Sequence, residues 1–238
     1  MTDALILTAL ELEARGLAHQ LELPRLTRFP FPVYERPGGS VRVAPVGLRA
    51  ALLLERGPAL AADLASPLVI SAGTCGALDP ALRVGDVVLP ESVLGLDGER
   101  LNVTPGALAR AVTLLGPEAR SGELLLTTAD VVPTPEAKAA RFRATGAVAV
   151  DLESAVILAW ASRHGCPSLV IRAVADTAQQ RLPVELGGVV TPEGRLRPIR
   201  AAALFVTHPR TIPQALSLQR GTGRALRSVA RVIAALAG

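Results

Sequence analysis

Two neighbouring stretches decide the fold: Val148-Ala149-Val150-Asp151-Leu152-Glu153-Ser154 and Leu169-Val170-Ile171-Arg172-Ala173-Val174-Ala175-Asp176. The first is a short apolar run that continues into a helical pattern ending near Gly165. The second is a continuous apolar run, typical of a buried parallel strand, and Asp176 stands at its C-terminal end. Ligands bind outside the carboxyl ends of the strands in open α/β sheets, so we expect Glu153 and Asp176 to share one crevice.

Both acids also have a purely structural explanation. Asp151 or Glu153 could cap the helix that follows, because a carboxylate accepts hydrogen bonds from the first free N–H groups of a helix. Asp176 could open a turn by bonding to its own backbone. These residues alone leave both explanations open.

The length and composition are those of one globular domain. A chain of 238 residues with 50% hydrophobic residues can bury a sizeable core. Its N-terminus has no basic segment ahead of the first apolar run, so it does not resemble a signal peptide. The longest uncharged apolar run, Leu64 to Leu78, is broken by Pro67 and two glycines and is too short to span a bilayer. We therefore expect a soluble, cytoplasmic protein.

Neither the cysteines nor the histidines form a recognisable ligand set. Cys75 and Cys166 lie far apart, and the three histidines are scattered along the chain. No spacing typical of a zinc site is present, so we predict no metal and no cofactor. Cys75 lies in a glycine-rich segment without a histidine placed to activate it, which does not favour a catalytic thiol.

The positive charge of the chain is concentrated at its C-terminal end. Eight of the 25 basic residues follow Glu193, which leaves 17 basic against 21 acidic residues, a balance of −4. This distribution and an aromatic content of 3% argue against nucleic-acid binding. Residues 195–207 and 213–237 have helical patterns. The second helix could pack with an arginine-rich solvent face, or it could contact an anionic membrane surface.

Three motifs in order resemble the nucleoside phosphorylase and nucleosidase superfamily, which includes methylthioadenosine/S-adenosylhomocysteine nucleosidase. Val150–Ala155 and Val170–Asp176 resemble its paired ribose-binding and purine-binding signatures, and Gly73–Asp86 resembles a third conserved segment. The resemblance implies an α/β fold, a three-layer αβα sandwich around a mixed central β-sheet. It implies a single domain over residues 1–238 with a basic helical extension at about 195–238, and a homodimer or larger homo-oligomer.

The resemblance assigns the catalytic roles to two acids. Asp176 would be the general acid that protonates the purine at N7, and burial at a strand end could raise its pKa enough for this. Ala4–Ala9 predicts a first central strand, and helical spacing follows it, so Glu13 lies just past a strand end. In the nucleosidases that the chain resembles, this loop carries a glutamate that activates the attacking water. A favourable charge in the first turn of a helix is the alternative explanation for Glu13.

The resemblance also implies five substrate-binding residues. Glu153 would accept hydrogen bonds from the ribose hydroxyls, and Leu152 would pack against the sugar. Gly73 and Thr74 belong to a loop that touches the ribose and the nucleophile, where we predict a turn whose backbone N–H groups bind an oxygen. Val132 stands where an aromatic residue often stacks on the base.

One departure from the superfamily pattern, together with the presence of Glu13, favours water as the nucleophile. Phosphorylases of the group carry an arginine two residues before Gly73 to hold phosphate, and here that residue is Ser71. A second departure concerns the acid: the better-known nucleosidases have a serine before the aspartate, and here Ala175 removes that supporting hydrogen bond. We expect hydrolysis of a purine nucleoside, with adenine as the base. The alternatives are a phosphorylase with phosphate as co-substrate and a nucleoside-binding protein without catalytic activity.

The C-terminal third has the order of residues found in the hopanoid-associated phosphorylase branch. Ala175-Asp176-Thr177-Ala178, Leu182-Pro183 and Ile212-Pro213 carry this weaker resemblance. It adds adenosylhopane, a lipid-linked nucleoside, to the candidate substrates, beside other 5′-substituted adenosines. The basic C-terminal helix would then approach a substrate that sits in a membrane. The residues do not determine the group on ribose C5′.

Overall fold

The computed structural model describes residues 3–116, 119–183, 190–195, 197 and 212–237. Within these residues, nine strands form one mixed sheet. The strands are β1 (Ala4–Thr8), β2 (Tyr34–Glu35), β3 (Val41–Pro45), β4 (Leu68–Ala77), β5 (Val87–Leu94), β6 (Arg100–Asn102), β7 (Ala119–Thr127), β8 (Ala149–Asp151) and β9 (Ser168–Asp176). The helices are α1 (Glu11–Gln20), the short 3-10 helix η1 (Leu48–Ala50), α2 (Leu53–Ala61), α3 (Pro105–Leu115), α4 (Pro135–Thr145), α5 (Ser154–Arg163) and α7 (Ile212–Ala237).

The sheet closes on itself at one end. Its order is β2-β3-β1-β4-β8-β7-β5-β6, and β9 pairs with both β4 and β5. Strands β4, β9, β5, β7 and β8 therefore form a ring with a filled apolar interior, which includes Val88, Leu125, Val170 and Val174. β9 is parallel to β4 and antiparallel to β5. All nine residues of β9 are buried, which agrees with its continuous apolar sequence.

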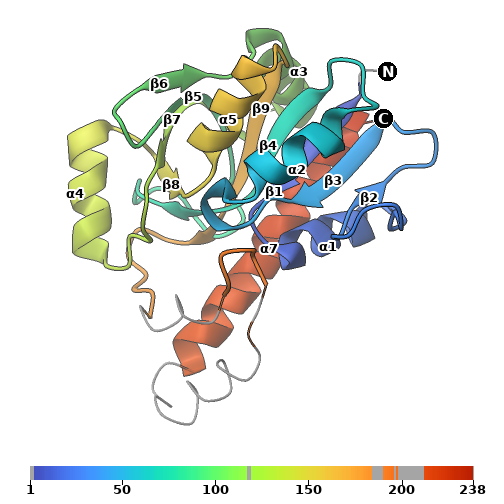
Figure 1. Ribbon diagram of the computed structural model, residues 1–238. Coiled ribbons are helices and arrows are strands. Elements are labelled where there is room, and N and C mark those ends of the chain that lie inside the picture. Colours follow the sequence, from blue (N-terminus) through green and yellow to red (C-terminus); the bar gives the residue numbers. More distant parts are fainter. Residues whose placement is uncertain (1–2, 117–118, 184–189, 196, 198–211, 238) are drawn as a thin grey trace.

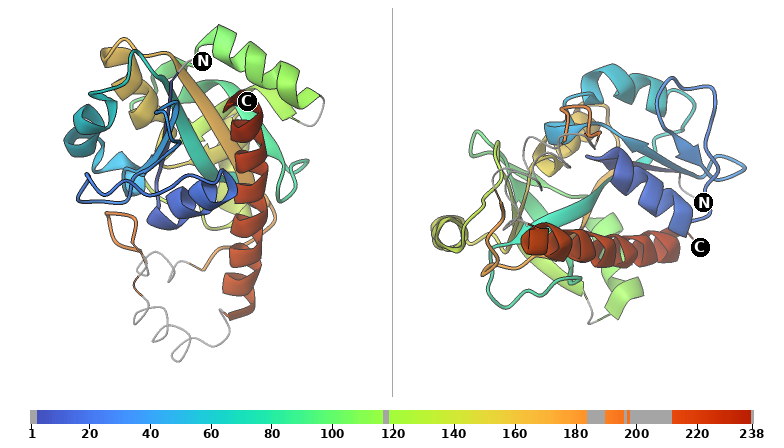
Figure 2. Two further views of the ribbon diagram at one scale, coloured as in Figure 1. Left: turned by 90° about the vertical axis from the view of Figure 1, so that its right-hand side faces the viewer. Right: turned by 90° about the horizontal axis from the view of Figure 1, so that it is seen from below.

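Helices cover both faces of the sheet and confirm the predicted three-layer arrangement. On one face, α1, α3 and α7 pack over a cluster that includes Ile6, Ile70 and Ile171 (Figure 2). On the other face, α2 and α5 pack over Leu5, Leu7 and Val69. These two sets alternate along β1 and β4, as they do when a strand is buried on both sides. α4 stands apart at the edge of the ring (Figure 1).

The C-terminal helix α7 lies against β9, α1 and α3 (Figure 2). Its Ala225, Val229 and Ile233 are buried in the core, whereas its arginines are exposed. This is the arrangement expected for an arginine-rich solvent face, and contact with a membrane stays a prediction. Among the described residues, no helix combines the length and the apolar character needed to cross a bilayer. The helix predicted at 195–207 lies almost entirely outside the described residues.

One local prediction was wrong. The segment that begins at Gly73 was expected to form a turn after a short strand, but β4 continues through it to Ala77. β9 and β8 flank this part of β4 and supply backbone partners for it, with a bulge between Cys75 and Gly76. Tertiary pairing therefore overrides the local preference of a glycine-rich sequence for a turn.

Candidate active site

The acids predicted for the site converge on the last residues of β4. A Cβ added to Gly73 would lie 2.9 Å from Oε1 of Glu13, and a Cβ added to Gly76 would lie 3.1 Å from Oδ2 of Asp176. Glycine at both positions therefore leaves room for a carboxyl group above the strand. Three residues of a regular strand span about 10 Å, so the two glycines lie at most about 10 Å apart along β4, with a bulge between Cys75 and Gly76.

Glu13 lies in the first turn of α1 and is 2% exposed. Its Oε1 accepts hydrogen bonds from the backbone N and from Oγ1 of Thr74, both at 3.1 Å. Its Oε2 accepts one from the backbone N of Leu10 at 3.2 Å. The predicted site residues Glu13, Gly73 and Thr74 are thus in contact. The Thr74 N–H group, predicted to bind a ligand oxygen, binds the carboxylate of Glu13 instead.

Arg172 connects the neighbouring acids through a buried network. Its Nη2 lies 2.7 Å from Oδ2 of Asp151, and both side chains are 1% exposed. The same nitrogen donates to Oγ of Ser71 at 2.9 Å and to Oγ of Ser154 at 3.1 Å. Asp151 also accepts hydrogen bonds from Thr127 Oγ1 at 2.7 Å and from the Ser154 backbone N at 3.1 Å. The charge of Arg172 is therefore neutralised by Asp151 inside the protein.

Glu153 is 4% exposed, and its ion pair with Arg172 is longer than the one that Asp151 makes. Its Oε2 is 3.8 Å from Nη2 of Arg172, and its Oε1 accepts one hydrogen bond, from the backbone N of Arg49 at 3.0 Å. Burial raises the pKa of Glu153 to about 7; Arg172 opposes that shift and the charge of Asp151 adds to it. Near neutral pH this carboxyl can accept or donate a hydrogen bond, which suits a site for hydroxyl groups.

The helix-capping explanation applies to Asp151 and not to Glu153. Asp151 accepts the N–H of Ser154 at the start of α5, whereas Glu153 makes no side-chain capping bond. The side chain of Arg49 pairs with Asp130 at 3.0 Å on the surface. The contribution of Arg49 is its backbone N–H, which no sequence pattern identifies.

Asp176 ends β9 and is 5% exposed. Its Oδ2 accepts a hydrogen bond from Nζ of Lys138 at 2.5 Å. Burial raises the pKa of Asp176, and the ammonium ion of Lys138 opposes this without reversing it. Lys138 is the only lysine in the sequence. No sequence pattern predicts that its side chain reaches Asp176, which lies 38 residues later in the chain.

The two apolar residues predicted for the site differ in their surroundings. Leu152 is half-buried between Asp151 and Glu153. Val132 is 8% exposed and packs in an apolar cluster with Leu78, Leu126 and Val150. The cluster extends toward the site through Val150, whose side chain lies near Gly76. Val132 therefore contributes apolar packing beside the strand ends.

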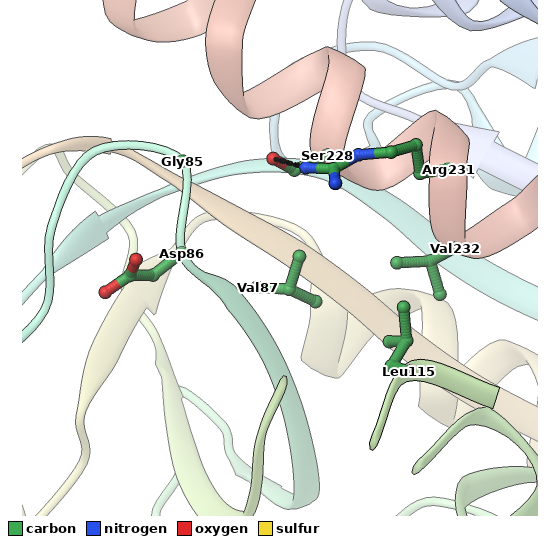
Figure 3. A pocket seen from close by; sticks show the side chains of 7 residues that line it. All are labelled: Gly85, Asp86, Val87, Leu115, Ser228, Arg231 and Val232. Carbon is green, nitrogen blue, oxygen red and sulfur yellow. Dashed lines mark hydrogen bonds between the residues drawn. The ribbon is translucent and has the colours of Figure 1, made fainter. Parts of the chain in front are cut away.

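The thiol of Cys75 is buried beneath the site, and burial raises its pKa, so it stays protonated. A separate open pocket of about 400 Å³ lies between the start of β5, the end of α3 and α7 (Figure 3). Its lining shares no residue with the acid cluster and consists of Gly85, Asp86, Val87, Leu115, Ser228, Arg231 and Val232.

Known structures share this fold over nearly the whole chain. A 5′-methylthioadenosine/S-adenosylhomocysteine nucleosidase from Neisseria meningitidis, solved with methylthio-immucillin-A, has a TM-score of 0.74 at 19% identity, covering 99% of this chain and 98% of that one. The 5′-methylthioadenosine/S-adenosylhomocysteine nucleosidase of Colwellia psychrerythraea, solved with adenine, has a TM-score of 0.72 at 18% sequence identity. The match covers 100% of this chain and 95% of that one. Futalosine hydrolase of Helicobacter pylori has a TM-score of 0.71 at 15% sequence identity, and the match covers 99% of this chain and 97% of that one.

At the level of sequence, no curated protein matches the chain. The sequence profile described as Phosphorylase superfamily matches residues 49–188, which is more than half of the chain. The match contains Gly73, Thr74, Glu153 and Asp176, whereas Glu13 lies ahead of it. The chain belongs to the phosphorylase superfamily and is an enzyme that cleaves a glycosidic bond.

Proposed function

We propose that the enzyme hydrolyses the N-glycosidic bond of a purine nucleoside and releases adenine. The observation that carries the proposal is the pair of carboxyls, Glu13 and Asp176, held over glycines at most about 10 Å apart on one strand. A ligand between them would meet a carboxyl at each end. Glu153, in the adjoining buried cluster, supplies a third carboxyl for the sugar between those ends.

The three acids match the three requirements of the reaction. The bond to C1′ breaks with its electron pair moving to the base, and Asp176 donates its proton to N7 so that neutral adenine leaves. Glu13 takes a proton from water as the water oxygen bonds to C1′ of the oxocarbenium-like ribose. General acid or base catalysis by a positioned side chain contributes typically about 10² to 10⁴ in rate. Both protons re-equilibrate with solvent before the next turnover.

Glu153 is the proposed partner of the ribose hydroxyls. Its pKa of about 7 allows it to bind a hydroxyl in either protonation state. In the ionised state its bonds are charge-assisted, worth about 1.5 to 3 kcal/mol, and its charge favours the cationic ribose. Leu152 is proposed to pack against the sugar, and Val132 to bound the base region.

Water is favoured over phosphate by the charges around the expected nucleophile position. Ser71 is neutral, and Arg172 is already paired with Asp151. The N–H and hydroxyl groups of Thr74 are occupied by the carboxylate of Glu13, whose negative charge would repel phosphate. Phosphate as co-substrate is the alternative, and formation of ribose 1-phosphate would establish it.

The candidates for the group on ribose C5′ come from the ligands of the solved relatives and from the basic helix α7. The Neisseria relative was solved with a methylthio analogue and the Colwellia relative with adenine. Adenosylhopane is our candidate for a lipid-linked substrate, and the exposed arginines of α7 would then face an anionic membrane. We also expect a homodimer or larger homo-oligomer. Neither expectation enters the mechanism above.

The test is adenine release from a panel of 5′-substituted adenosines, with and without phosphate. We expect release at an undiminished rate in phosphate-free buffer, with a free sugar as the second product. Strict dependence on phosphate would replace hydrolysis by phosphorolysis. Tight adenine binding without turnover of any member of the panel would contradict both reactions.

A further inference from the structure

Lys138 is an unusual residue in this chain and in its helix. It is the only lysine, and it is the only fully buried residue of α4, with 0% of its surface exposed. Thr134 is the N-cap of α4, where its hydroxyl accepts the N–H of Ala137, and the helix stands at the edge of the ring (Figure 1). Lysine is among the residue types least often buried, because its ammonium ion loses hydration. A specific contact must therefore hold it in place.

The ammonium group meets three oxygen atoms. Nζ of Lys138 donates to Oδ2 of Asp176 at 2.5 Å, to the carbonyl of Thr177 at 2.7 Å and to the carbonyl of Gln180 at 3.1 Å. A charged ammonium has three donors and a neutral amine has two, so this is the arrangement of the charged form. Arginine would not reproduce it, because a planar guanidinium cannot direct three bonds from one atom.

The contact leaves one oxygen of Asp176 available. Among the described residues, no hydrogen-bond donor reaches Oδ1 of Asp176. The carboxyl lies over Gly76, where a Cβ would come within 3.1 Å of Oδ2 and 3.4 Å of Oδ1. Glycine at this position therefore keeps the carboxyl uncovered from the side of β4.

We propose that Lys138 positions the acid of the reaction: its ammonium ion holds Oδ2 of Asp176 and so presents Oδ1 to the leaving base. This rests on the function proposed above, because it gives Asp176 the protonation of that base. Lys138 does not touch the substrate in this scheme and acts through Asp176. Its bonds to Thr177 and Gln180 fix the backbone that follows the acid.

The same contact affects when Asp176 holds its proton. The titratable groups that face Asp176 are Lys138 from α4 and the thiol of Cys75 from β4, and Arg172 on the same strand is paired with Asp151. Burial raises the pKa of Asp176, and Lys138 opposes it. Without the ammonium charge, burial acts alone, and Asp176 keeps its proton to a higher pH.

The first test is the pH dependence of adenine release by Lys138→Met. The rate falls on the alkaline limb when the acid loses its proton, so we expect this limb to move to higher pH. We also expect kcat to fall at least about tenfold, with a much smaller change in KM, because a general acid must be well placed. The matched control is Arg141→Met, which removes an exposed cation one turn further along α4. We expect this variant to keep both the alkaline limb and the kcat of the wild type.

The second test needs no turnover. Because Lys138 is the only lysine, a protein without a lysine-containing tag, labelled with lysine carrying ¹³C at Cε and ¹⁵N at Nζ, has a single lysine side-chain NMR signal. We expect this signal to show slowly exchanging ammonium protons and to shift as Asp176 titrates. Asp176→Asn should abolish that transition, and added adenine should move the signal of the wild type.

The outcomes separate this proposal from the proposed function. An unmoved alkaline limb in a folded, active Lys138→Met variant would overturn the positioning role and leave hydrolysis intact. A fast-exchanging lysine signal that is indifferent to Asp176→Asn would also overturn it, even if Lys138→Met failed to fold. Absence of adenine release by the wild type would contradict the proposed function, whatever the lysine signal showed.

Discussion

At the scale of single residues, the site depends on how each buried charge is neutralised. Arg172 is paired with Asp151, and Lys138 is paired with Asp176, whereas Glu153 has one backbone hydrogen bond and a pKa near 7. The pairing explains why five charged groups can lie so close together inside the fold. It also leaves one carboxyl able to change its protonation near neutral pH.

Glu153 should make the stability of the protein depend on pH. Its pKa is near 4.3 in an unfolded chain and about 7 in the fold, so the folded state holds the extra proton between these values. Stability contributed by this group is therefore present below about pH 4 and is lost as pH rises to about 7, a change of roughly 4 kcal/mol. Denaturant unfolding of Glu153→Gln at pH 5 and pH 8 should lack this component.

The exposed Glu91→Gln is the control for that experiment, and it should keep the pH dependence of the wild type. If the free energy of unfolding changed equally between pH 5 and pH 8 in the wild type and in Glu153→Gln, Glu153 would be ionised in the folded protein over this range. The same Glu153→Gln variant should release adenine at least about a hundredfold more slowly, because it cannot become the charged acceptor of the ribose hydroxyls.

The pair of Lys138 and Asp176 predicts a pattern of stabilities. Asp176→Asn leaves the ammonium ion buried without its counter-charge, which costs about 3 to 5 kcal/mol in comparable pairs. Lys138→Met should cost less, because Asp176 can keep its proton, and the double variant should recover much of the loss caused by Asp176→Asn. A double-mutant cycle by denaturant unfolding measures the coupling. Strictly additive losses would mean that the two groups do not interact.

At the scale of elements, α7 supports the end of β9 through a close approach. A Cβ on Gly221 would lie 2.2 Å from the backbone carbonyl oxygen of Ala175, the residue before Asp176. Alanine normally stabilises a helix relative to glycine by about 1 kcal/mol. Here Gly221→Ala should instead destabilise the protein and lower adenine release, because the clash is with backbone.

Gly223 provides the matched comparison on the same helix. A Cβ there meets nothing nearer than 3.8 Å, at Nη1 of Arg227. Gly223→Ala should therefore be neutral or stabilising, by up to about 1 kcal/mol. Thermal unfolding of the two variants side by side decides the point. If Gly221→Ala were as stable as Gly223→Ala, the close contact between α7 and the backbone of β9 at Gly221 would be absent.

The local sequence pattern was sufficient to predict many of the helices and strands, and to place Glu153 and Asp176 at the ends of such elements. The apolar run before Asp176 predicted β9, and helical spacing after Ser154 predicted α5. The extension of β4 past Gly73 and the insertion of β9 between β4 and β5 could not be predicted, because strand pairing depends on distant residues. Lys138 was missed for the same reason: burial of one polar side chain on a polar helix is decided by the tertiary fold.

At the scale of the whole molecule, the closed ring of strands makes the site possible. β4 lies between β8 and β9, so the ends of three strands bring Asp151, Gly76 and Asp176 together. β1 runs parallel to the first half of β4, on the side opposite β9, and leads into α1, which carries Glu13. The three proposed functional acids thus come from segments that span more than 160 residues of sequence: Glu13 from the start of α1, Glu153 from the start of α5 and Asp176 from the end of β9.

The central claim is tested most directly by adenine release from 5′-methylthioadenosine in phosphate-free buffer, comparing Glu13→Gln with Glu11→Gln. Both residues lie in the first turn of α1, but Glu11 is on the surface and pairs with the exposed Arg195. We predict that the wild type and Glu11→Gln release adenine at rates within about twofold, while Glu13→Gln is at least about a hundredfold slower. Undiminished release by Glu13→Gln, or no release without phosphate, would contradict the account.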